Sequence, residues 1–197
     1  MNAAEHMVEA YFRLCRNCFT ISDRKVAAGN NRQLDILAYD LRTKTQFHIE
    51  VSVTHRENWC CTFAELTGQF ERKFLGVPPK RDGAVGGATD FEKGKTYLPQ
   101  IETAYVECGF SPADVKRVWI CWMVKGEDNS KPIIAKFGLG HPKGPFEIEV
   151  LSLRDYVLPA LEKKTGTANY DDEILRIIGF MKERAAHVVA QSEHPCG

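Results

Sequence analysis

The chain lacks an excess of charge of either sign, a long apolar run and an N-terminal targeting pattern. Its 197 residues include 26 basic and 26 acidic side chains, so the formal net charge is zero. A zero sum does not favour nucleic acid as a partner, but a local basic patch would still bind it. No stretch approaches the length of a membrane span, and the first residues lack the basic and apolar segments of a signal peptide. We therefore expect a cytoplasmic protein without a membrane partner.

The seven cysteines form no disulfide framework, because their number is odd and the chain is not small. Cys15 and Cys18 have the spacing of a zinc-binding pair, but no second such pair follows. Free thiols in a reducing compartment are the prediction. The sequence also has no Ser-His-Asp set, dinucleotide fingerprint, haem motif, P-loop or helix-turn-helix pattern. These absences remove several common enzyme and DNA-binding classes.

The apolar residues that are present make up 44% of the chain, which suits a single domain over residues 1–197 with a real core. Apolar periodicity predicts helices over 3–17, 59–75, 97–108, 152–164 (bent near Pro159) and 171–190. It predicts strands over 18–23, 33–40, 46–53, 115–124, 133–137 and 146–151. Residues 76–95 are rich in Gly and Pro and predict a flexible loop. The expected fold class is α/β (α+β), with a mixed central β-sheet flanked by helices.

The segment over residues 33–54 predicts a β-hairpin, because apolar residues alternate on both sides of a turn centred on Arg42 and Thr43. This turn would pair Tyr39 with Gln46 and Leu37 with His48. It would also set Asp35 opposite Glu50, with Cβ atoms roughly 4.5–5.5 Å apart.

Two carboxylates that share one face of a hairpin indicate a site for a hard divalent cation such as Mg²⁺. Two alternatives stay open: one carboxylate points to solvent, or the register slips by one residue and the acids take opposite faces. The turn lacks the Asn-Gly pattern that would fix the register.

The order of these motifs resembles the PD-(D/E)xK nuclease superfamily, which has the restriction-endonuclease-like fold. The matching segments are a first helix with Glu5, the run from Asn31 to Ala38 with Asp35, and the run from Ile49 to Val53 with Glu50. The resemblance covers roughly residues 3–75. It implies that Asp35 and Glu50 bind Mg²⁺ or Mn²⁺ and that Glu5 assists. From its position alone, Glu5 is also an ordinary acid in a helix's first turn, and Glu9 is the alternative acid one turn along.

Ser52 stands where the family has the lysine of its Glu-x-Lys motif. In the family this lysine positions the attacking water and stabilises the charged transition state, and a serine hydroxyl carries no charge. The family often places Gln or Lys on the next helix, where this chain has Gln69 and Lys73 four residues apart on one helix face. One alternative is that Lys73 or Gln69 takes the role of this lysine, and the other is that the chain is an inactive relative. Lys73 is also consistent with an ordinary surface lysine.

Basic residues before and after the hairpin would contact phosphates if the chain binds nucleic acid. They are Arg24, Lys25, Arg32, Lys80 and Arg81. The first expectation is a metal-dependent, endonuclease-like phosphodiesterase, a hydrolase that acts on nucleic acid, with DNA as the expected substrate. The alternative is an inactive nuclease-fold module that binds nucleic acid or a protein partner, and a homodimer is also kept open.

Overall fold

The predicted hairpin forms in the expected register and contributes two neighbouring strands of a larger sheet. A computed structural model describes residues 1–27, 32–53, 61–77, 96–166 and 172–193, with side chains up to Ala186. Strand β2 (Gln33–Asp40) pairs antiparallel with β3 (Thr45–Ser52), and Tyr39 lies opposite Gln46 and Leu37 opposite His48. The Asp40 carboxylate accepts hydrogen bonds from the backbone N–H groups of Arg42 and Thr43 and so supports the turn. This side chain fixes a register that the turn sequence alone left open.

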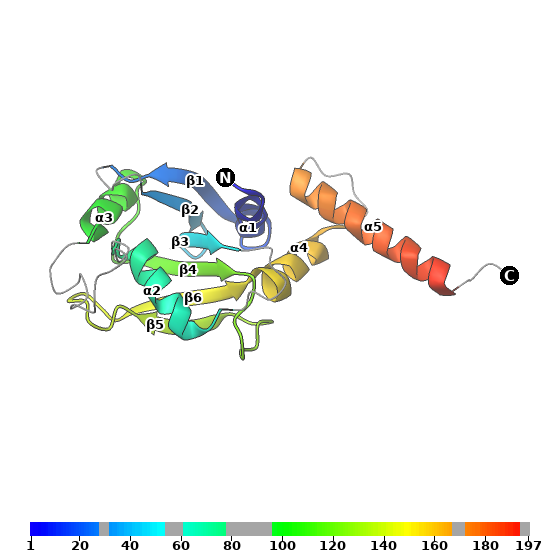
Figure 1. The fold of residues 1–197 in the computed structure, drawn as a ribbon. Coiled ribbons are helices and arrows are strands. Elements are labelled where there is room, and N and C mark those ends of the chain that lie inside the picture. The colour runs from blue at the N-terminus through cyan, green and yellow to red at the C-terminus, as the bar shows by residue number, and fades with distance from the viewer. Residues whose placement is uncertain (28–31, 54–60, 78–95, 167–171, 194–197) are drawn as a thin grey trace.

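The sheet is mixed and has the strand order β1-β2-β3-β4-β6-β5 within the described residues (Figure 1). The other strands are β1 (Cys18–Lys25), β4 (Val115–Cys121), β5 (Ile133–Phe137) and β6 (Phe146–Ser152). Strands β3, β4 and β6 run parallel, whereas β1, β2 and β5 pair antiparallel with their neighbours. The predicted fold class, a mixed α/β sheet flanked by helices, is therefore confirmed.

Helices cover both faces of this sheet. Helices α1 (Ala3–Leu14), α4 (Leu158–Lys164) and α5 (Glu173–Glu193) share one apolar core with Ile36, Ile49 and Val118. Helix α2 (Phe63–Phe74) packs on the other face, where Phe70 and Phe74 meet Trp119 edge to face. Helix α3 (Leu98–Glu107) packs there beside β2 and β4. Helix α5 extends away from the sheet (Figure 1).

Several element ends differ from the prediction for local reasons. Helix α1 ends at Leu14, and Asn17 adopts the left-handed conformation (φ 56°) that this residue type tolerates after a helix. Helix α2 begins after the N-cap Thr62, and the predicted start at Trp59 lies outside the described residues. The predicted helix over 152–164 is a π turn, Leu153–Val157, followed by α4, whose first turn contains Pro159 because proline needs no intrahelical donor there.

Candidate active site

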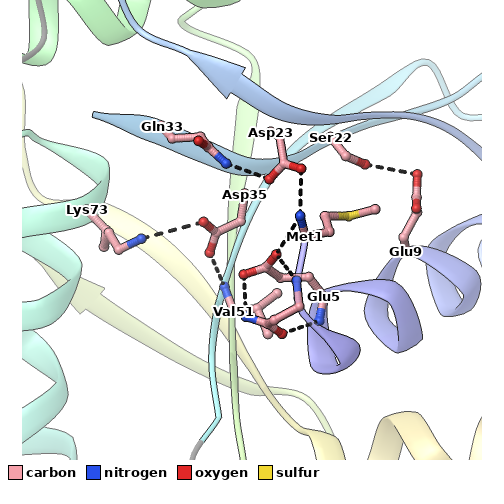
Figure 2. A network of polar contacts seen from close by, with 10 residues as sticks. Met1, Glu5, Glu9, Ser22, Asp23, Gln33, Asp35, Val51 and Lys73 are labelled. Carbon is pink, nitrogen blue, oxygen red and sulfur yellow. Dashed lines mark hydrogen bonds and ion pairs between the residues drawn. The ribbon is translucent and has the colours of Figure 1, made fainter. Parts of the chain in front are cut away.

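The two hairpin carboxylates lie on adjacent strands at the end of the described β2–β3 ladder. The ladder stops at the pair Ile36 and Ile49, and Asp35 and Glu50 occupy the next positions of the same register. Asp35 Oδ2 accepts a hydrogen bond of 2.8 Å from the backbone N–H of Val51 (Figure 2). This bond ties the carboxylate of β2 to the backbone of β3.

Lys73 of α2 makes ion pairs with both carboxylates. Its Nζ lies 3.6 Å from Asp35 Oδ1 and 2.5 Å from Glu50 Oε2. Helix α2 positions this ammonium because its apolar stripe, with Phe70 and Phe74, packs on the sheet and turns the flanking Lys73 toward the hairpin. Figure 2 shows Lys73 approaching one oxygen of the Asp35 carboxylate, while the Val51 N–H meets the other. A lysine distant in sequence therefore stands beside the acid pair.

Each carboxylate has one oxygen that is hydrogen-bonded to a residue of β3 and a second oxygen that points toward the Lys73 ammonium. Asp35 Oδ2 is held by Val51, and Glu50 Oε1 is held by Nε2 of His48 at 2.8 Å. The remaining oxygens, Oδ1 and Oε2, converge on Lys73. Glu50 Oε2 is buried, and Lys73 is its ion-pair partner among the described residues. Two carboxylate oxygens, which are hard ligands for a metal ion, thus meet at the Lys73 ammonium.

Burial and charge set the protonation of the site. Burial, followed by the charge of Glu50, raises the pKa of Asp35 to about 7, although Lys73 and the Val51 N–H act in the opposite direction. Burial also acts to raise the pKa of Glu50, but contacts with His48 and Lys73 outweigh it and lower that pKa below its ordinary value. For Lys73, the two carboxylates outweigh burial and raise the pKa. The site holds an ionised Glu50, a protonated Lys73 and an Asp35 that titrates near neutrality.

His48 and Tyr105 extend this polar cluster into the core, and the sequence analysis missed both. His48 Nδ1 lies 2.6 Å from the Tyr105 hydroxyl of α3, and both side chains are fully buried. Burial lowers the pKa of His48 more than the contact with Glu50 raises it, so the imidazole is neutral at pH 7. The period-two spacing of His48 and Glu50 on one strand was a signal that could have identified the histidine.

Glu5 lies near Asp35 but serves as a helix cap. Its Oε2 accepts from the backbone N–H of Asn2 (2.8 Å) and its Oε1 from the Asn2 side chain (2.6 Å), while Asn2 Oδ1 accepts from the Glu5 N–H. The N-terminal ammonium of Met1 lies between Glu5 and Asp23, 2.9 Å from Asp23 Oδ2 (Figure 2). The alternative acid Glu9 accepts hydrogen bonds from two hydroxyls of β1 instead. The expected catalytic assistance by Glu5 stays a prediction.

Ser52 and Gln69 lie on the elements that carry the acid pair and Lys73. Ser52 is half-buried on β3, two residues after Glu50, and pairs with Cys121 of β4. Gln69 is half-buried on α2, one turn before Lys73. Their roles at the site stay predictions.

Of the three expected phosphate contacts that lie in the described residues, Arg32 is the one that the structure places beside the helix end with Lys73. Its Nη1 donates to the backbone oxygen of Arg72, next to Lys73, and its guanidinium lies 5.6 Å above the Tyr97 ring. Arg24 forms an ion pair with Glu107. The Lys25 side chain is exposed at the end of β1. Lys80 and Arg81 lie outside the described residues, together with most of the loop predicted at 76–95.

No group of three or more His, Cys, Asp or Glu side chains suited to a metal ion occurs in the described part of the chain. Across the same residues, no helix has the length and apolar character that crossing a bilayer requires. Comparisons with protein-family models, with curated proteins and with solved structures give no match for this chain. Any assignment of function therefore depends on the geometry of the acid pair and Lys73.

Proposed function

We propose that the chain is a metal-dependent phosphodiesterase of the PD-(D/E)xK type that cleaves nucleic acid, with DNA as the expected substrate. The observation that carries this proposal is the convergence of Asp35, Glu50 and Lys73 from three different elements. Two carboxylates and one ammonium are the charged groups that phosphodiester hydrolysis by this type of site requires. The restriction-endonuclease-like fold and a cytoplasmic location belong to the same proposal.

The donor set fits Mg²⁺ or Mn²⁺. Asp35 Oδ1 and Glu50 Oε2 are hard oxygen donors that converge on the Lys73 ammonium. Mg²⁺ is usually held by one or two carboxylates together with water and substrate phosphate. A bound divalent ion would lower the pKa of a water and neutralise charge that develops on the phosphate. Glu50 would hold it as a permanent anion, whereas Asp35 would first have to lose the proton that it keeps below about pH 7.

Lys73 would replace the motif lysine that Ser52 lacks. Its raised pKa keeps the ammonium charged at neutral pH, and α2 holds it within ion-pair distance of both acids. A preorganised positive charge at this place would stabilise the anionic transition state. Arg32, anchored on Arg72 and Tyr97, would bind a neighbouring phosphate.

The inactive module remains the second candidate, and one observation favours it. The Lys73 ammonium already pairs with both carboxylates, as it would in a purely structural ion-pair cluster. On this account the chain would bind nucleic acid or a protein partner without cleavage, or act as a homodimer.

Cleavage assays on single- and double-stranded DNA and RNA, with Mg²⁺, Mn²⁺ or EDTA, separate the two candidates. We expect wild-type cleavage with Mn²⁺ that EDTA stops and that Glu50→Ala abolishes. Lys116→Ala serves as the matched control, because Lys116 is exposed on β4 and belongs to none of these contacts. Equal rates for the wild type and Glu50→Ala at matched purity would identify a contaminant and contradict the proposal.

A further inference from the structure

A chain of hydrogen bonds runs from the core to the acid pair. It joins the Tyr105 hydroxyl to His48 Nδ1 at 2.6 Å and His48 Nε2 to Glu50 Oε1 at 2.8 Å. Tyr105 and His48 are 0% exposed and Glu50 is 1% exposed. Burying three polar side chains in contact is costly unless each is hydrogen-bonded, and apolar residues of similar size would fill the space at lower cost. The proposed cleavage chemistry assigns no role to His48 or Tyr105.

The directions of these hydrogen bonds follow from the groups involved. The ionised Glu50 is an acceptor only, so His48 Nε2 must carry the hydrogen that it donates to Oε1. In a neutral imidazole Nδ1 is then a bare acceptor, and the Tyr105 hydroxyl donates to it. Without the Tyr105 hydroxyl, Nδ1 would be a buried acceptor that has lost this donor, and the ring would lose the hydrogen bond that fixes its orientation.

His48 also contacts the element that carries Lys73. Its ring meets the Phe74 ring edge to face, with centroids 4.7 Å apart. Phe74 is the last residue of α2 and directly follows Lys73. His48 therefore fixes one oxygen of Glu50 and packs against the end of the helix that brings the ammonium to the other oxygen.

We propose that Tyr105 and His48 are positioning residues, which hold Glu50 so that only Oε2 is directed at Lys73 and at a bound divalent cation. This inference rests on the proposed metal site. Tyr105 fixes the orientation of the His48 ring, and His48 fixes the orientation of Glu50. A group that hydrogen-bonds a metal ligand directly, as His48 would, typically changes metal affinity 10- to 100-fold when it is lost. Tyr105 acts one hydrogen bond further out, so we expect a smaller effect from its loss.

The test combines nitrogen NMR of the metal-free protein with calorimetric titration of Mn²⁺ alone. In the wild type we expect the His48 hydrogen on Nε2. Tyr105→Phe should keep this tautomer, because Glu50 is still its acceptor, and should weaken Mn²⁺ binding by about 10-fold, the lower end of that range. Tyr156→Phe is the matched control, because Tyr156 is a half-buried tyrosine that packs in the apolar core on the other face of the sheet, where its ring meets Tyr11.

Two substitutions of His48 separate positioning from packing. A Gln amide nitrogen lies where Nε2 lies in His, whereas the shorter Asn reaches only the place of Nδ1. His48→Gln should therefore keep Mn²⁺ affinity within about threefold of the wild type, and His48→Asn should lower it about 10- to 100-fold. A role in packing alone would not rank Gln above Asn in this way.

The outcomes distinguish this inference from the proposed function. A His48 hydrogen on Nδ1 in the wild type overturns the positioning role, as does wild-type Mn²⁺ affinity in both Tyr105→Phe and His48→Asn. A wild-type chain that binds no Mn²⁺ contradicts the metal site itself, and the positioning role falls with it. The wild-type titration alone identifies this last case.

Discussion

Lys73 Nζ lies 2.5 Å from Glu50 Oε2, although the lysine is on α2 and the glutamate is on β3. In the nuclease family that the sequence resembles, the corresponding lysine is on the same strand as the acid, at the position of Ser52. In this chain the positive charge beside Glu50 comes from α2 and not from β3. Whether Lys73 replaces the lysine that is absent at position 52 can therefore be tested by substitution.

Lys73→Ala should lower Mn²⁺-dependent cleavage about 100-fold or more, because it removes a preorganised positive charge from the site. Adding Ser52→Lys to this variant should restore part of the activity, since the new ammonium would stand two residues after Glu50 on β3. Steady-state rates of the wild type, the single variant and the double variant measure both effects. If Lys73→Ala leaves the cleavage rate unchanged, Lys73 has no catalytic role, and the inactive module is favoured.

Asp35→Asn should remove a pH dependence of stability. The folded-state pKa of Asp35 is raised from 3.8 to about 7, so between these values the folded state holds a proton that the unfolded state has lost. Raising the pH through this window therefore destabilises the wild type and not the variant. In EDTA, the variant should gain on the order of 4 kcal/mol relative to the wild type between about pH 4 and pH 8. Urea unfolding at each pH measures this difference, and a constant difference would contradict the raised pKa.

Arg32→Gln should weaken nucleic-acid binding and reduce its dependence on salt. Each phosphate contact contributes about 0.9 to the slope of log affinity against log salt, so the slope should fall by about 1. Arg24→Gln is the matched variant, and we expect a smaller change because Arg24 is paired with Glu107. Fluorescence anisotropy at several salt concentrations provides the slopes. Equal slopes for the wild type and Arg32→Gln would exclude Arg32 from the interface.

Glu5→Gln should separate capping from catalysis. Gln can replace Glu in a capping box, so we expect the stability to stay within about 0.5 kcal/mol, whereas Asn2→Ala should cost about 1 kcal/mol. Because both Glu5 oxygens contact Asn2, cleavage by Glu5→Gln should fall far less than cleavage by an Asp35 variant. Thermal unfolding and cleavage rates check the two parts. A loss of activity as large as that of Asp35→Asn would place Glu5 among the metal ligands.

The strands and the acid pair could be predicted from the sequence because they depend on short-range patterns. Alternating apolar residues in 33–54 set the faces of the hairpin, and the spacing of Phe70 and Phe74 turned Lys73 toward the site. The Asn2-x-x-Glu5 pattern also contained the capping box, which the sequence analysis did not use.

The remaining contacts could not be predicted because they join residues that only the tertiary structure brings together. Tyr105 meets His48 across the packing of α3 on the sheet, and no local pattern links the two. Arg32 meets Tyr97 in the same way, across different parts of the chain. Burial, which raises the pKa of Asp35 and lowers that of His48, likewise exists only in the folded chain.

The central claim is that Asp35 and Glu50 jointly hold a divalent cation beside Lys73. Anomalous X-ray scattering from crystals soaked in Mn²⁺, compared with crystals of Glu50→Gln, tests it most directly. We predict an Mn²⁺ peak in coordination contact with Asp35 Oδ1 and Glu50 Oε2 in the wild type, and none there in the variant. A wild-type map without a peak at these two oxygens, with Lys73 still paired to both carboxylates, would contradict the account.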